Sequence, residues 1–150
     1  MKKIIAFVVV LSLTASGAFA QELLNLIKKD LNKEKRSLVA EAMDIKKENE
    51  TAFWNLYSAY EAENDKLIDN RAANIKKFAD NYETLTPEVA DELAKTALKV
   101  QADRAKINAA YYKKMSKVVG NIQAARFIQV MNQVQLVLDI QVASEIPLIE

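Results

Sequence analysis

The chain has 150 residues, a formal net charge of +1, no cysteine and no histidine. This length suits one ordinary domain, and a nearly neutral charge gives no general affinity for nucleic acid. The lack of both residue types excludes disulfides, thiolate or imidazole metal ligands, and every catalytic arrangement that needs histidine or cysteine.

The N-terminus has the layout of a cleavable signal peptide. Lys2 and Lys3 give a positive start, residues 4–13 are almost continuously apolar, and small residues end at Ala20 before Gln21. The apolar run is much shorter than the roughly 20 residues of a membrane-spanning helix. We therefore expect cleavage between Ala20 and Gln21 and export to the periplasm, with a retained anchor as the alternative. No second apolar stretch has spanning length, so the mature chain is expected to lack a transmembrane segment.

Residues 21–150 are predicted to form a single all-helical domain. This part contains one glycine, Gly120, and two prolines, Pro87 and Pro147. Folds built from strands and turns need more such residues at their corners, so their scarcity favours a few long helices.

Apolar residues recur at intervals of three, four or seven along four segments, as in amphipathic helices. The expected helices span residues 22–43, 46–82, 87–118, and a last segment from Gly120-Asn121 to about 144. Thr86-Pro87-Glu88 predicts the start of the third helix, with threonine as N-cap, proline at the first position and an acid in the first turn. Gly120 is expected to break the third helix, and Pro147 to end the fourth.

The short connection at residues 83–86 predicts that the second and third helices form an antiparallel hairpin. Charge agrees, because residues 41–69 carry eight acids and three lysines, whereas residues 104–138 carry six basic residues and no acid. The expected neighbours are Asp65 with Arg104, Glu63 with Lys106, and Glu50 with Lys117. A bare hairpin buries too little core to be stable, so the two flanking helices or a second copy of the chain must cover it.

Glu61, Asp65 and Asp69 follow one another at intervals of four residues on one helical face. Such carboxylates could hold a hard cation, or one of them could serve as an acid with a raised pKa. The reading that we favour is a solvated face paired with basic residues such as Arg104 and Lys106. We therefore expect no metal site, no cofactor, no catalytic residue and no enzymatic activity.

Phe53, Tyr57 and Tyr60 lie at helical spacing, which is typical of a core or of a seam against another helix. Trp54 lies slightly off this stripe and is the best candidate for an exposed aromatic contact.

The basic residues Lys113, Lys114, Lys117 and Arg126 lie close in sequence to Tyr111, Tyr112 and Phe127, and this stretch could meet an anionic client, a lipid head group or a polysaccharide. The alternative is a charged outer face without such a role. The partner surface that we predict comprises Trp54, Lys113, Lys114, Lys117, Arg126 and Phe127. The following helix is apolar nearly all round between residues 127 and 142, so we expect it centrally, in a dimer seam, or against a partner.

Two short segments resemble a known family. Met43-Asp44-Ile45-Lys46-Lys47-Glu48-Asn49 opens one predicted helix, and Leu85-Thr86-Pro87-Glu88-Val89 opens another. They resemble the two Leu-Thr-x-x-Gln repeats of the Spy/CpxP family, exported helical stress proteins of Gram-negative envelopes. The first copy has Ile45-Lys46 and ends in Asn49, and the second has Val89 in place of glutamine. The resemblance implies a bent helical hairpin, usually a cradle-shaped dimer that holds unfolded clients or reports envelope stress.

Nearly the whole mature chain is also similar to a group of uncharacterised exported bacterial proteins. The matching features are Phe53-Trp54, Tyr57, Tyr60, Ala124-Ala125-Arg126-Phe127, Gln129 and Ile146-Pro147-Leu148. This likeness implies no activity.

The function that we expect is a periplasmic, chaperone-like binding protein that contacts unfolded or envelope proteins as a homodimer. One alternative is a structural adaptor that docks on a specific envelope protein. Another is a metal-stress protein, which the lack of histidine and cysteine disfavours.

Overall fold

The computed structural model describes residues 34–149, and no strand occurs among them. The chain divides into two compact units after Leu38, so residues 34–38 belong to the first unit and are helical, and the other described residues belong to the second. The all-α prediction is confirmed for this part of the chain. The predicted signal peptide, its cleavage site at Ala20 and Gln21, and the predicted helix between residues 22 and 33 lie outside the described residues.

The second unit begins with the end of a helix at residues 39–42, close to the predicted end at residue 43. The 3-10 helix η1 (Lys47–Asn49) follows and leads into α2 (Glu50–Asn81). Helix α2 starts later than the predicted residue 46, because Lys46 is extended and the next residues turn more tightly than an α-helix. A second 3-10 helix, η2 (Tyr82–Thr84), ends this segment.

Helix α3 (Pro87–Glu145) begins with the predicted cap. Thr86 is extended, and its Oγ1 accepts a hydrogen bond from the Val89 backbone N–H at 3.3 Å, while Pro87 occupies the first turn. Hydrogen bonds from its own backbone N–H and from Thr86 lower the pKa of the exposed Glu88 carboxyl. The Thr-Pro-Glu helix start is therefore confirmed.

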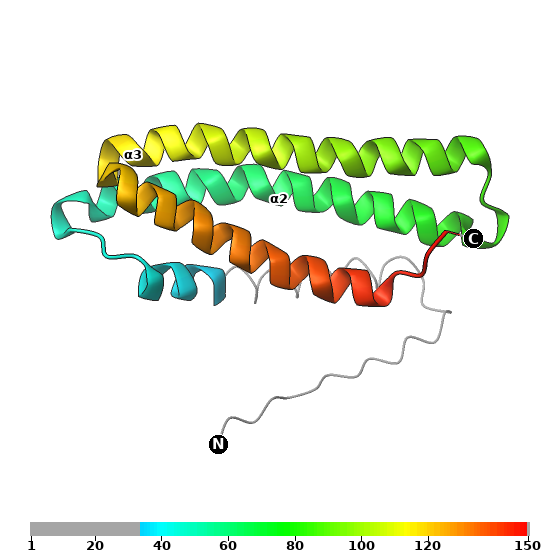
Figure 1. The fold of residues 1–150 in the computed structure, drawn as a ribbon, viewed down its shortest axis with the longest axis horizontal. Coiled ribbons are helices and arrows are strands. Elements are labelled where there is room, and N and C mark those ends of the chain that lie inside the picture. Colours follow the sequence, from blue (N-terminus) through cyan, green and yellow to red (C-terminus); the bar gives the residue numbers. More distant parts are fainter. Residues whose placement is uncertain (1–33, 150) are drawn as a thin grey trace, which may run out of the picture. The chain divides into compact units, whose positions relative to one another are not determined.

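Gly120 interrupts α3 with φ 80° and ψ 164°. Residues with a Cβ rarely adopt this conformation, so glycine is required where the chain changes direction. Figure 1 shows the chain turning back at this point, so that residues 87–119, the first half of α3, are followed by a returning half, residues 121–145. The returning half ends at Ile146, which is extended before Pro147. Both predicted helix ends, at Gly120 and before Pro147, are confirmed.

Helix α2 and the first half of α3 form the predicted antiparallel hairpin (Figure 1). The Tyr60 hydroxyl donates a hydrogen bond to Asn108 Oδ1 at 2.9 Å, and Lys77 Nζ lies 2.5 Å from a Glu92 carboxylate oxygen. Both pairs are nearly symmetric about Leu85, so the predicted register is correct.

The ion pairs predicted from this register do not form, although the register itself holds. Glu63 accepts a hydrogen bond from the Tyr111 hydroxyl at 2.8 Å, and Lys106 pairs with Asp103 of its own helix at 3.0 Å. Arg104 pairs with Asp139 of the returning half at 3.7 Å. The reason is geometric: register fixes the height of a residue along the hairpin, whereas the rotation of each helix about its axis decides which side chain it meets.

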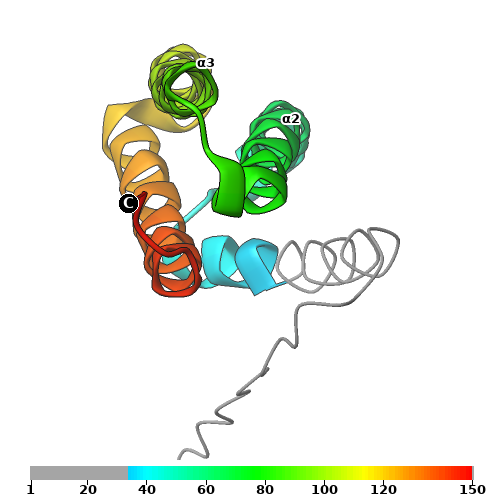
Figure 2. The same ribbon diagram turned by 90° about the vertical axis from the view of Figure 1, so that its right-hand side faces the viewer.

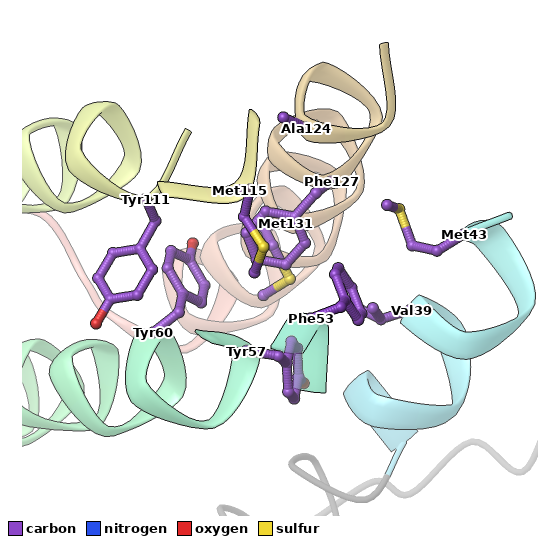
Figure 3. Packing of buried hydrophobic residues seen from close by; sticks show 10 residues of the cluster. All are labelled: Val39, Met43, Phe53, Tyr57, Tyr60, Tyr111, Met115, Ala124, Phe127 and Met131. Carbon is purple, nitrogen blue, oxygen red and sulfur yellow. The ribbon is translucent and has the colours of Figure 1, made fainter. Parts of the chain in front are cut away.

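One apolar core joins α2 to both halves of α3 (Figure 3). Its buried members are Val39, Met43, Phe53, Tyr57, Tyr60, Tyr111, Met115, Ala124, Phe127 and Met131. The Phe127 ring meets Phe53, Tyr57 and Tyr60 edge to face at centroid distances of 6.0, 6.3 and 5.1 Å. Such pairs each contribute about 0.5–1.5 kcal/mol beyond area burial. The predicted aromatic core is confirmed.

A polar chain runs across the same three helical segments. Tyr60 donates to Asn108, and Asn108 Nδ2 donates to Asn132 Oδ1 at 3.2 Å. Burial of Tyr60 raises its pKa to about 12, with smaller effects from Asn64, which lowers it, and Glu61, which raises it. Figure 2, which looks along the helices, shows α2 and the two halves of α3 around a common interior.

Candidate binding surfaces

The structure divides the predicted partner surface between the core and the exterior. Phe127 is 0% exposed and lies in the aromatic core, so its assignment to a partner surface is wrong. The helix that carries it has two apolar faces, and the face that contains Phe127 turns inward against Phe53 and Tyr60. Trp54 is half-buried, with its ring edge to face against Phe53 and Tyr57.

The basic residues of the predicted surface are all exposed. Lys114 Nζ lies 4.1 Å from the centroid of the Tyr111 ring, a cation–π contact with a core residue. Lys117 stands in the last turn before Gly120, where a positive charge is favoured by the helix dipole, and Lys113 and Lys114 lie one turn earlier. The contact of these lysines with a partner stays a prediction.

The prediction that Glu61, Asp65 and Asp69 share one solvated face is wrong, because the three carboxylates differ in burial. Glu61 is buried, Asp65 is partly buried and Asp69 is exposed. Within residues 34–149, no group of three or more carboxylates is placed so that it could hold a metal ion.

A groove of about 830 Å³ lies between α2, the first half of α3 and the end of the chain. Phe78 and Leu93 are buried along it, and Ile75 and Val100 line it together with the exposed Leu148. This volume falls within the range of about 300–1,000 Å³ of small-molecule sites. The body of the groove is therefore apolar and large enough for a ligand.

The charged side chains of the groove form one cluster. A carboxylate oxygen of Asp139 pairs with Arg71 and accepts a hydrogen bond from Gln135 at 2.8 Å, and the other oxygen lies 3.7 Å from Arg104. Burial lowers the pKa of Arg104, an effect that Asp139 opposes and Arg71 reinforces. Two guanidinium groups thus share one carboxylate at the edge of an apolar groove.

The returning half of α3 presents a second surface, which we call the outer face. It consists of Ile122, Ala125, Arg126, Gln129, Gln133, Leu136, Val137 and Ile140, all exposed. Leu136, Val137 and Ile140 are 60%, 56% and 61% exposed and adjoin one another at helical spacing. A shallow hollow of about 390 Å³ lies beside Gln129 and Leu136. This face contains five apolar residues, one charge and no acid.

Sequence reasoning predicted that the last helix is apolar enough to associate, but it missed the groove. The three charged residues of the groove come from α2 and both halves of α3, so no local motif joins them. The sequence feature that could have pointed to the groove is Asp139, the one acid between residues 104 and 144. An isolated acid in an apolar helix usually has a partner when it is buried.

No protein-family model, curated protein or solved structure matches the chain. The resemblance to the Spy/CpxP family therefore stays an expectation that rests on two short motifs. The second motif does open α3, and the first lies before α2 and across η1. Among residues 34–149, no helix has both the length and the apolar character needed to cross a bilayer.

Proposed function

We propose that this protein is a non-catalytic, chaperone-like binding protein of the bacterial periplasm that holds partly unfolded proteins on its outer face. The observation that supports the proposal is the exposure of Leu136, Val137 and Ile140 on a helix that also packs into the core. On soluble proteins, contiguous patches of exposed apolar residues often mark interaction sites.

The composition of the outer face fits a client without a fixed sequence. Its apolar residues alternate with Gln129 and Gln133, and Arg126 is its one charged residue. Apolar burial is non-directional, so it accepts many unfolded segments, and glutamine side chains can donate to or accept from client backbones. Binding that depends on a small apolar area is weak and reversible, as a holding function without ATP requires.

An aggregation assay tests this proposal. Two unrelated unfolding clients are heated or diluted from denaturant with the protein at near-stoichiometric ratio, and light scattering is followed. We expect the protein to suppress the aggregation of both clients. The variant Leu136→Gln/Ile140→Gln should lose most of the protection, because glutamine keeps helix propensity but removes the apolar contact.

Two controls separate the outer face from the other surfaces. Leu98→Gln changes an equally exposed leucine on the first half of α3 and should leave protection unchanged. Reversal of charge at Lys113, Lys114 and Lys117 tests the basic surface. Full protection by that variant would show that the three lysines are not part of the client site. Protection that survives in Leu136→Gln/Ile140→Gln, with its melting temperature intact, would contradict the proposal.

The same samples test the two predictions on association. We propose a homodimer, and sedimentation of the parent protein should give twice the chain mass.

An adaptor would ignore both clients and capture one envelope protein, so failure to protect either client would overturn the chaperone-like function.

A further inference from the structure

The groove beneath the end of the chain has an unbalanced positive charge. Arg71 and Arg104 share the single carboxylate of Asp139, which leaves a formal charge of +1. The side chain of Arg104 is only 16% exposed, and its Nε–H is buried without a hydrogen-bond acceptor. A buried donor without a partner is costly, and more so when it is charged, so a ligand oxygen at this point would be strongly favoured.

The body of the groove suits hydrocarbon better than an extended peptide. Its floor is made of Ile75, Phe78, Leu93 and Val100, and the Asn74 side-chain amide already donates to the Leu93 carbonyl at 3.1 Å. An extended peptide would bring a backbone N–H and C=O at every residue, each costly to bury without a partner. A hydrocarbon chain has no such groups.

We propose that the groove binds a single-chain anionic amphiphile. Its carboxylate or phosphate oxygens contact Arg104 and Arg71, and its hydrocarbon chain lies along Phe78 and Leu93 toward Leu148. Both head groups offer the planar or forked oxygens that a guanidinium recognises. Asp139 competes with the ligand for the two arginines and keeps them in place when the groove is empty. This site is separate from the outer face, so it does not depend on the proposed function.

Calorimetry with dodecanoate below its micelle concentration tests the proposal on the intact protein. We expect saturable binding with one ligand per chain. Dodecanol, which has the same tail and no charge, should bind at least tenfold more weakly, and dodecyltrimethylammonium should not bind. Lysophosphatidate compared with dodecanoate then tells a phosphate head from a carboxylate head, and lysophosphatidylcholine, whose phosphate is neutralised by its choline, should bind much more weakly than lysophosphatidate.

Variants assign the binding to the two parts of the groove. Arg104→Gln should weaken dodecanoate at least tenfold, whereas Lys113→Gln, which removes an exposed charge outside the groove, should have no effect. Ala97→Trp places a large ring in the groove and should abolish binding of dodecanoate and dodecanol alike. A melting curve for each variant confirms that it folds.

Asp139→Asn gives the sharpest result. It removes the competing carboxylate, so we expect dodecanoate to bind several-fold more tightly, whereas a purely structural role for Asp139 would weaken binding. The proposal is overturned if dodecanoate fails to saturate one site, or if Arg104→Gln binds it as the parent does. It is also overturned if an apolar peptide with both ends blocked occupies the groove while dodecanoate does not.

Discussion

Phe127 carries more of the tertiary packing than its place in the sequence suggests. Its ring is enclosed by aromatic residues of α2 and lies on the returning half of α3, so it joins segments that are far apart along the chain. Because the interior is close-packed, removal of the ring would leave a cavity that its neighbours fill only in part.

We expect Phe127→Ala to lower the free energy of unfolding by about 3–5 kcal/mol. Chemical denaturation followed by circular dichroism measures this change. Tyr112→Ala, at an exposed position on the same helix, should cost less than about 1 kcal/mol. Equal effects of the two substitutions would place Phe127 outside the core.

Tyr60 makes the stability of the fold depend on pH in the alkaline range. Its pKa in the folded protein is about 12, above the ordinary value of 10.0, because burial disfavours the phenolate. The folded state therefore keeps a proton that the unfolded chain loses, and stability falls as pH rises from 10 toward 12. The loss is on the order of 2–3 kcal/mol over that interval.

Denaturation curves between pH 8 and 12 check this expectation against Tyr60→Phe. The variant lacks the phenol, so its stability should fall less steeply above pH 10 than that of the parent. The pKa of Tyr111 is also raised to about 12, by burial and by the Glu63 carboxylate. Tyr111 is present in both proteins, so its effect on the slope cancels in the comparison. Identical slopes would show that the pKa of Tyr60 is the same in the folded and the unfolded chain, and would contradict the expectation.

At the scale of the helices, Gly120 decides the topology. A straight α3 would carry the apolar returning half away from α2, whereas the break at φ 80° lets it fold back into the same core. Apart from the adjoining stretch of chain, no atom lies within 4 Å of the place where a Cβ would stand, so backbone strain and not collision with a packed neighbour makes glycine necessary here.

We expect Gly120→Ala to destabilise the protein by about 1–3 kcal/mol, the cost of a strained backbone conformation. Thermal unfolding measures the effect, with the exposed helical substitution Gln129→Ala as a control that should be nearly neutral. An unchanged or higher melting temperature in Gly120→Ala would mean that the break is not required for the fold.

The helices show which features a sequence can predict. Thr86-Pro87-Glu88 and Gly120 act through their own backbone conformations, so the start and the break of α3 were predictable from residue type alone. The orientation of the returning half was not predictable, because a helix with apolar residues on two sides has no periodicity that selects the inner one. Phe127 was therefore placed on the surface, and the link between Arg104 and Asp139 was missed.

For the whole molecule, the outer face and the groove suggest that the protein acts by binding other molecules. The core of the described chain is closed by aromatic packing and by the Tyr60–Asn108–Asn132 hydrogen bonds, yet Leu136 and Ile140 stay in solvent. Exposed apolar side chains contribute little to folding, so their presence on a helix that is already anchored suggests a role toward other molecules.

Site-specific photocrosslinking tests this claim most directly. A benzophenone side chain is placed at Ile140 of the outer face, and in a matched variant at Leu98, and each is irradiated with two unrelated unfolding clients. We expect crosslinks to both clients from position 140 and few from position 98. Equal labelling from the two positions, or labelling from position 98 alone, would contradict the assignment of the outer face as the client-binding surface.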